Sequence, residues 1–160
     1  MILFTVGTHT QPFDRLVKAA DQYAAKHKET EIIIQKGVST YECKNAISFD
    51  FCPQEDMQKY SEEADIIVMQ GGWGAMREAI DKKKKIIAVP RIEGLEHIHN
   101  QEQVVRKLES LGCVLGVYNI EDLEQTIEKA KIFDFKPLVR GNANIIKETL
   151  ERWFNLKSNK

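Results

Sequence analysis

Short runs of branched apolar residues recur six times along the chain, each flanked by polar or turn-forming residues. Runs of three to five such residues are typical of strands that are buried on both faces of a sheet. The runs cover residues 2–6, 32–34, 47–51, 66–69, 86–89 and 114–117. The pattern therefore predicts six short buried strands.

Between these runs, apolar residues recur every three or four positions, which places them on one face of a helix. The patterns contain Phe13, Leu16, Val17, Ala20 and Tyr23; Met57, Tyr60 and Ala64; Val104, Val105, Leu108 and Leu111; Leu123, Ile127 and Ala130; and Ile145, Ile146, Thr149, Leu150, Trp153 and Phe154. Strands that alternate with helices predict an α/β fold, a mostly parallel sheet with helices on both faces. Ligands of such sheets bind where loops leave the carboxyl ends of the strands.

Length and composition indicate one domain. The chain has 160 residues, 42% of them hydrophobic, which suffices for one core and is too little for two ordinary domains. We expect the domain to cover residues 1–156, with a polar tail at 157–160. With 23 basic and 24 acidic residues, the net charge of -1 gives no support for a broad nucleic-acid-binding surface.

The cysteines Cys43, Cys52 and Cys113 are far apart and lack the paired spacing of a zinc or redox motif. Reduced thiols in a cytoplasmic protein are the simplest interpretation. The apolar start of the chain is too short for a signal peptide or a membrane span, and no later segment is long enough to be a span. If the protein works at a membrane, another molecule brings it there.

The first predicted strand is followed by the segment GTHTQ at residues 7–11 and by a helix that Pro12 opens. A loop that enters a helix presents unpaired backbone N–H groups, which suit an anion. Thr8, His9 and Thr10 add side-chain donors. The alternative is a plain strand-to-helix turn, in which Gly7 provides backbone freedom.

The segment QGGWGA at residues 70–75 follows the fourth predicted strand. Its three glycines let the backbone approach a ligand closely, and the helix N-terminus behind them offers partial positive charge to a diphosphate. The segment has neither the Lys-Ser/Thr ending of a Walker loop nor the fingerprint of dinucleotide-binding folds. Glu78 lies one turn into the helix, where a carboxylate can accept hydrogen bonds from two vicinal ribose hydroxyls. The alternative is an acid that the helix dipole favours in a first turn.

The long polar segment at residues 91–101 follows the fifth predicted strand and ends at a helix start, where sugar hydroxyls can meet amide and carboxylate partners. His97 and His99 with Glu93 or Glu96 suggest a metal site, because alternate residues of an extended segment share a face. No fourth ligand is indicated, so no metal is expected.

Several segments together resemble a known family. They are VGTHTQPFDRLV at the start, FCPQEDMQKYSEEADIIVMQGGWGAMREAI in the middle, VPRIEGLEHIHNQ after it, and GNANIIKETL near the end. They resemble the nucleotide-binding, C-terminal half of two-domain inverting glycosyltransferases of the GT-B type, and in particular the small family 28 C-terminal-like proteins that exist as this half alone. That family includes the catalytic subunits of the two-part GlcNAc transferase of dolichol-linked glycan assembly and of bacterial capsule and exopolysaccharide transferases. The resemblance implies a Rossmann-like sheet.

The resemblance also implies roles for the middle block. Phe51 and Gln54 fall where such transferases place groups around the uracil base, and Glu78 matches the acid that binds the ribose. The loop that holds the diphosphate is matched by Gly72, Trp73, Gly74 and Ala75.

Four residues outside that block match as well. Asn100 and Gln101 match the pair that contacts the donor sugar, and Gly7 and Thr8 match the first-strand loop that faces the interdomain cleft. Many relatives have His where Gln70 stands, and Gln can donate a hydrogen bond to phosphate without carrying positive charge, so weaker diphosphate binding is expected.

The lysine run at residues 82–85 falls at the end of a predicted helix, where cations offset the negative end of the dipole. We interpret it as a solvated helix terminus. In relatives the sequence Gly-Lys-Pro stands where this chain has Lys83-Lys84-Lys85, so a favourable helix stop is lost while the site is left untouched.

The implied reaction is transfer of a sugar from a UDP-sugar to a lipid-linked acceptor with inversion, without a metal or other cofactor. A membrane-anchored partner subunit would bind the acceptor, and the last predicted helix would dock on it or pack on the protein's own sheet. His9 is the local candidate for the general base. The alternatives are a non-catalytic UDP-binding or assembly module and a self-associating transferase.

Overall fold

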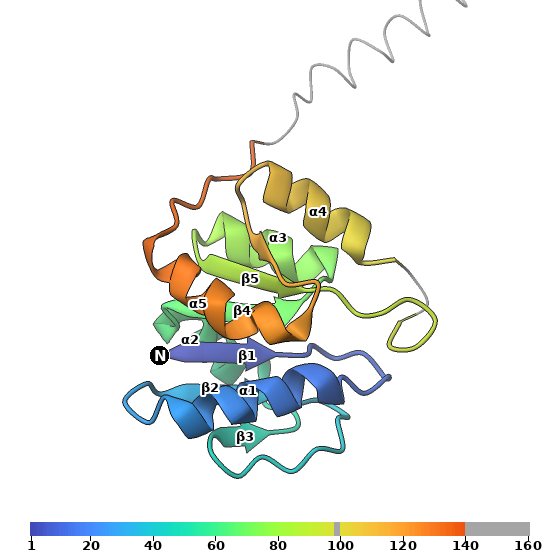
Figure 1. Cartoon of the computed structure of the whole chain (residues 1–160), viewed down its shortest axis with the longest axis vertical. Coiled ribbons are helices and arrows are strands. Elements are labelled where there is room, and N and C mark those ends of the chain that lie inside the picture. Colours follow the sequence, from blue (N-terminus) through green and yellow to red (C-terminus); the bar gives the residue numbers. More distant parts are fainter. Residues whose placement is uncertain (98–99, 140–160) are drawn as a thin grey trace, which may run out of the picture.

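The computed structural model describes residues 1–97 and 100–139, which form a parallel sheet between two layers of helices (Figure 1). The strands are β1 (Ile2–Thr5), β2 (Ile32–Gln35), β3 (Ile47–Phe49), β4 (Ile66–Gln70), β5 (Lys85–Val89) and β6 (Leu115–Gly116). They lie in the order β3-β2-β1-β4-β5-β6, and every neighbouring pair is parallel. The predicted α/β fold and all six predicted strands are confirmed. The predicted helix at residues 145–154 and the polar tail lie outside the described residues.

The helices of the described residues cover both faces of the sheet. They are α1 (Asp14–Lys26), α2 (Gln54–Glu63), α3 (Trp73–Asp81), α4 (Glu102–Ser110) and α5 (Leu123–Ile132), with a 3-10 turn at Ile120–Asp122. Successive strand residues point to opposite faces. Phe4 and Val68 therefore pack in the core under α1 and α5, whereas Leu3 and Ile67 pack in the core under α2, α3 and α4.

The strand order reverses between β1 and β4. The chain leaves β1 toward β2 and β3, returns through α2, and enters β4 on the other side of β1. The loops after β1 and β4 therefore depart in opposite directions and leave a crevice at the carboxyl edge of the sheet, which is where open α/β sheets bind ligands.

The third strand is shorter than predicted. It ends at Phe49 rather than at residue 51, because the neighbouring backbone of β2 turns away at Gly37, whose φ is +56°. Hydrogen bonds from the N–H groups of Lys36 and Gly37 to the carbonyls of Phe49 and Asp50 close the ladder. Phe51 consequently lies in a loop with a 52% exposed side chain.

The connection from β2 to β3 contains no helix and is held by a carboxylate of α1. Asp21 is 1% exposed and accepts hydrogen bonds from the backbone N–H groups of Lys44 and Asn45 at 2.9 and 2.7 Å. Its other oxygen accepts from the side chains of Asn45 and Tyr41. Burial alone would raise the pKa of Asp21, but the hydrogen bonds from Asn45, Lys44 and Tyr41 together lower it.

We expect Asp21→Ala to destabilise the protein by about 2–4 kcal/mol at pH 7, because buried donors lose a charged acceptor. A carboxylate with a lowered pKa stabilises the folded protein above the pKa of the unfolded chain, which is about 3.9. This stabilisation is lost as the pH falls through the pKa of the folded state. Urea unfolding should therefore show the gap between wild type and variant narrowing below about pH 4. Asp134→Ala, which removes an 82% exposed carboxylate, is the control, and an Asp21→Ala gap that is independent of pH would contradict this account.

The lysine run ends α3 in a strained conformation. Lys83 has a φ of +57°, and its N–H donates to the carbonyl of Ile80 while that of Lys84 donates to Ala79. This is a Schellman C-cap, in which glycine normally occupies the position of Lys83. The ammonium of Lys84 binds the carbonyls of Glu62 and Ala64 at 2.6 and 3.2 Å, so it caps α2 rather than its own helix.

Lys83→Gly should stabilise the fold by about 1 kcal/mol, because glycine adopts a positive φ without a steric penalty. The measurement is the urea midpoint, with Lys83→Ala as the matched control that removes the ammonium and keeps the Cβ. Equal midpoints for the Gly and Ala variants would show that backbone strain at this position is negligible.

Candidate functional site

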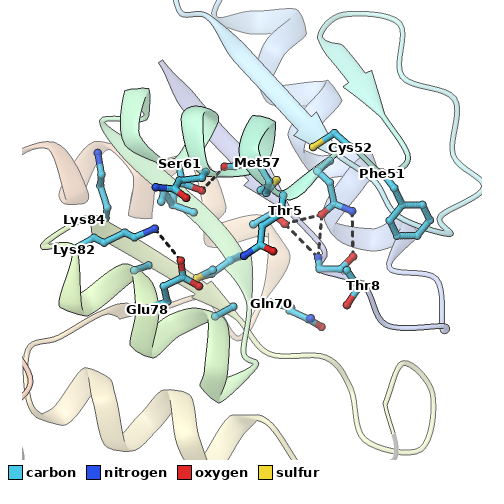
Figure 2. A pocket seen from close by; sticks show the side chains of 18 residues that line it. Thr5, Thr8, Phe51, Cys52, Met57, Ser61, Gln70, Glu78, Lys82 and Lys84 are labelled. Carbon is cyan, nitrogen blue, oxygen red and sulfur yellow. Dashed lines mark hydrogen bonds and ion pairs between the residues drawn. The ribbon is translucent and has the colours of Figure 1, made fainter.

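A cavity of about 330 Å³ opens between α2 and α3 at the carboxyl edge of the sheet (Figure 2). Its apolar wall includes Ile67 and Met69 of β4 and Met57 of α2. The predicted site residues that line it are Gly7, Thr8, Phe51, Gln54, Gln70, Ala75 and Glu78. The loop after β1, the segment that leads into α2 and the first turns of α3 therefore converge on one space.

The other predicted residues lie outside the cavity wall. Gly72 is the N-cap of α3, and Trp73 begins that helix with a 46% exposed side chain. Asn100, the residue before the N-cap of α4, accepts a hydrogen bond from the N–H of Gln103. Gln101 is 6% exposed, and its side-chain oxygen accepts a hydrogen bond from the backbone N–H of Arg91. A sugar contact by Asn100 and Gln101 stays a prediction.

A buried glutamine that the sequence analysis missed fixes the loop after β1. Gln35, the last residue of β2, accepts hydrogen bonds from the hydroxyl of Thr5 at 2.6 Å and from the N–H of Gly7 at 3.1 Å. Its amide nitrogen donates to the carbonyls of Gly7 and Asp50. A polar residue that ends an apolar run, as in IIIQ, was the available signal. The contacts hold the ends of β1, β2 and β3 in register around the cavity.

The N-terminus of α3 lies beside the cavity, and Ala75 of its first turn lines the wall. Gly72 provides no side-chain cap, and the first turn contains no acidic residue. The other α-helices of the described residues carry acids in that turn, at Asp14, Glu55, Asp56, Glu102 and Glu124. The positive end of the α3 dipole is therefore not neutralised by the protein's own carboxylates.

Glu78 lies on the cavity wall one turn into α3. Its carboxylate accepts a hydrogen bond from Lys82 Nζ at 2.8 Å, and its side chain is 68% exposed (Figure 2). An exposed pair of this kind contributes little to stability, so the carboxylate is available to a ligand.

A second missed residue, Arg91, joins the loops of the site. It follows β5 and is 2% exposed. Its Nη2 donates to the carbonyl of Val6 at 3.1 Å, and its Nη1 donates to those of Gln11 and Pro12 at 2.9 and 3.1 Å. Its Nε donates to Oε1 of Gln70 at 2.6 Å. The signal in the sequence was a charged residue just beyond a buried strand, separated from it only by Pro90.

Residues 91–97 after β5, the third loop of the site, are joined to α1 by an ion pair. Glu96 accepts two hydrogen bonds from Arg15 of α1 and one from the N–H of Ile92. Among the described residues no group of three or more His, Cys, Asp or Glu side chains could hold a metal ion, and His99 lies outside that part of the chain.

His9, the candidate general base, lies in the loop after β1 and does not line the cavity. The centroid of its ring is 4.4 Å from that of His97, so the loop after β1 and the third loop meet at these two rings. Its Nδ1 is 3.2 Å from the N–H of Gln11, which donates to it. Its catalytic role stays a prediction.

The three cysteines are free, and burial raises the pKa of each thiol. In the described part of the chain, no helix is long and apolar enough to cross a membrane.

Comparison with known proteins gives one family match. The model of the glycosyltransferase family 28 C-terminal domain matches residues 1–149. No curated protein sequence matches the chain significantly.

Solved structures share the fold. The glycotransferase of kitacinnamycin has a TM-score of 0.65 at 15% identity, and the match covers 82% of this chain and 34% of that one. The NMR solution structure of ALG13 has a TM-score of 0.61 at 18% identity and covers 93% and 94% of the two chains. MurG of Acinetobacter baumannii has a TM-score of 0.52 at 21% identity, with 81% and 40% covered. The chain thus spans about a third of the first structure and almost the whole of ALG13.

The glycines of the QGGWGA segment should respond differently to alanine. A Cβ at Gly71 would lie 2.8 Å from a methyl group of Val105 and 3.0 Å from Cβ of Gln101, whereas a Cβ at Gly74 meets nothing within 4 Å. We expect Gly71→Ala to destabilise the protein by about 1–3 kcal/mol through overpacking. Gly74→Ala should be neutral or stabilise by up to about 1 kcal/mol, because alanine favours a helix. Urea unfolding of the pair provides the measurement, and equal effects would contradict the packing at Gly71.

Proposed function

The chain belongs to the family of glycosyltransferase family 28 C-terminal domains, and from this premise we propose that it is the donor-binding catalytic subunit of an inverting transferase. It would transfer a sugar from a UDP-sugar to a lipid-linked acceptor. The observation that carries the proposal is the cavity between α2 and α3, where an uncapped helix N-terminus and Glu78 meet an apolar wall. A UDP-sugar would match these three features: its diphosphate the helix N-terminus, its ribose hydroxyls Glu78, and its planar base the apolar wall.

The nucleoside would occupy the α2 side of the cavity. Phe51 offers a half-exposed flat ring to the uracil base, and Gln54, the first residue of α2, offers an amide to its polar edge. Glu78 would accept hydrogen bonds from the two ribose hydroxyls, in exchange for its exposed pair with Lys82.

The diphosphate would lie at the N-terminus of α3. Backbone N–H groups of Trp73, Gly74 and Ala75 belong to the first turn, where they lack helical partners. They are fixed before the ligand arrives, so they can stabilise the charge that grows on the leaving diphosphate without reorganising. This mode of stabilisation requires no metal.

The reaction would form a bond between the acceptor oxygen and the anomeric carbon while the bond from that carbon to the diphosphate oxygen breaks. The bonding electrons leave with UDP, and the acceptor proton passes to a general base. His9 is the candidate base within this chain, since it lies in the loop after β1 next to His97. A base on the acceptor-binding partner is the alternative.

A second polypeptide would supply the acceptor site. The matched residues make up only 34% and 40% of the kitacinnamycin glycotransferase and MurG chains, so those proteins contain a further part that these residues do not provide. Trp73, Ile92 and Leu95 leave apolar side chains 46%, 46% and 77% exposed near the site, on α3 and the third loop. The partner would be membrane-anchored and would hold this cytoplasmic subunit at the membrane surface.

Glu78→Ala should weaken binding of UDP by about 10- to 100-fold, because two hydrogen bonds to a charged acceptor are lost. Isothermal calorimetry with UDP and UDP-GlcNAc measures the change, and binding should be the same in EDTA. The fold should be unaffected, since Glu78 is largely exposed.

The control is Glu128→Ala, which removes a comparable exposed ion pair from α5, away from the cavity. Equal binding by both variants would remove Glu78 from the site. If wild type binds no uridine nucleotide at millimolar concentration, alone or with its partner, the proposed function is wrong.

A further inference from the structure

We infer that Arg91 is a positioning residue for the phosphate end of the cavity: its Nε–H holds the carbonyl oxygen of Gln70, so that the amide nitrogen of Gln70 donates toward the diphosphate. This inference rests on the proposed function and extends it to a residue that does not itself line the cavity.

The orientation of the Gln70 amide follows from hydrogen-bond chemistry. A guanidinium only donates, so the side-chain atom of Gln70 that lies 2.6 Å from Arg91 Nε is the carbonyl oxygen. The NH₂ group must then lie on the other branch of the amide. A flipped amide would set two donors against each other at a short distance, which is costly inside a protein.

Arg91 cannot easily release this contact. It is 2% exposed, its two terminal nitrogens are held by carbonyls of the loop after β1, and its guanidinium lies 4.5 Å from the centre of the Phe13 ring. A buried cation retains its acceptors because losing one leaves a charged donor without a partner. The guanidinium is therefore a fixed support for Gln70.

The amide nitrogen of Gln70 faces the two glycines that border the phosphate end. A Cβ built on Gly7 would lie 2.4 Å from Gln70 Nε2, and one built on Gly72 would lie 3.7 Å from it. Gln70 also lines the cavity and is only partly buried. The NH₂ group thus lies between the loop after β1 and the N-cap of α3, next to the N–H groups proposed to hold the diphosphate.

The arrangement gives Gln70 a fixed polarity. With Oε1 turned to Arg91, the group presented to the ligand is a donor, which favours phosphate oxygens. Without Arg91 the amide could rotate and present its oxygen, which would repel them. Arg91 should therefore affect recognition of phosphate and leave recognition of the base and ribose unchanged.

The test compares uridine with UDP on ¹⁵N-labelled protein, using calorimetry and the side-chain amide signals in NMR spectra. UDP should shift the Gln70 NH₂ signal, which is assigned by its absence in Gln70→Glu, and uridine should leave it in place. Arg91→Lys keeps the charge and loses the planar donor. This variant should weaken the binding of UDP by about tenfold or more and the binding of uridine by less than about twofold. A purely structural role of Arg91 would weaken both ligands alike.

Gln70→Glu keeps an acceptor for Arg91 and replaces the NH₂ donor by an anionic oxygen, so it tests the inference even if Arg91→Lys fails to fold. It should bind uridine like wild type and lose the additional affinity for UDP. Undiminished UDP binding by Gln70→Glu, or a Gln70 signal that UDP leaves unmoved while UDP binds, overturns the inference and leaves the proposed function intact. Failure of wild type to bind either ligand overturns both.

Discussion

A charged group that is removed from water must find its hydrogen-bond partners inside the protein, and the site depends on how Arg91 meets that constraint. The guanidinium lies behind the carboxyl ends of β1, β4 and β5 and takes acceptors from Val6, Gln11 and Gln70. Burial lowers the pKa of Arg91, while the nearby Glu96 raises it, and an arginine remains charged in either case. The hydrogen bonds of one buried guanidinium therefore hold the loops around the cavity in place.

Most of the fold could be predicted from the sequence, because a strand that is buried on both faces of a parallel sheet consists of a continuous run of apolar residues. The strands at residues 2–5, 66–70 and 85–89 have that pattern and lie where it predicts. The end of the third strand could not be predicted, because it depends on the turn of the neighbouring strand at Gly37 rather than on its own residues. The loop between β2 and β3 depends in the same way on Asp21 of another element.

The candidate site could be predicted in part, where a local pattern carries the chemistry. Gly7, Gln70 and Glu78 were predicted because glycine-rich loops and helix starts have local signatures, and in the structure they line one cavity. Gln35 and Arg91 were missed because their partners are distant in sequence: Arg91 bonds to residues 79 to 85 positions away. The guanidinium also gives a reason for a neutral side chain at position 70, because a protonated histidine there would face a second cation at hydrogen-bond distance.

The helix on the far side of the cavity differs from the others, because none of its residues is buried. Met57 and Tyr60 of α2 are only partly covered; Tyr60 stacks on Phe49, and Met57 borders the cavity. A ligand that fills this space gives α2 its first fully buried contacts. If the helix became more ordered on binding, part of the interaction energy would be spent on that ordering, and the measured affinity would be lower than the contacts alone would give. Under the proposed function, the UDP product would be held less tightly for the same reason, and a lightly packed helix over the site would favour its release.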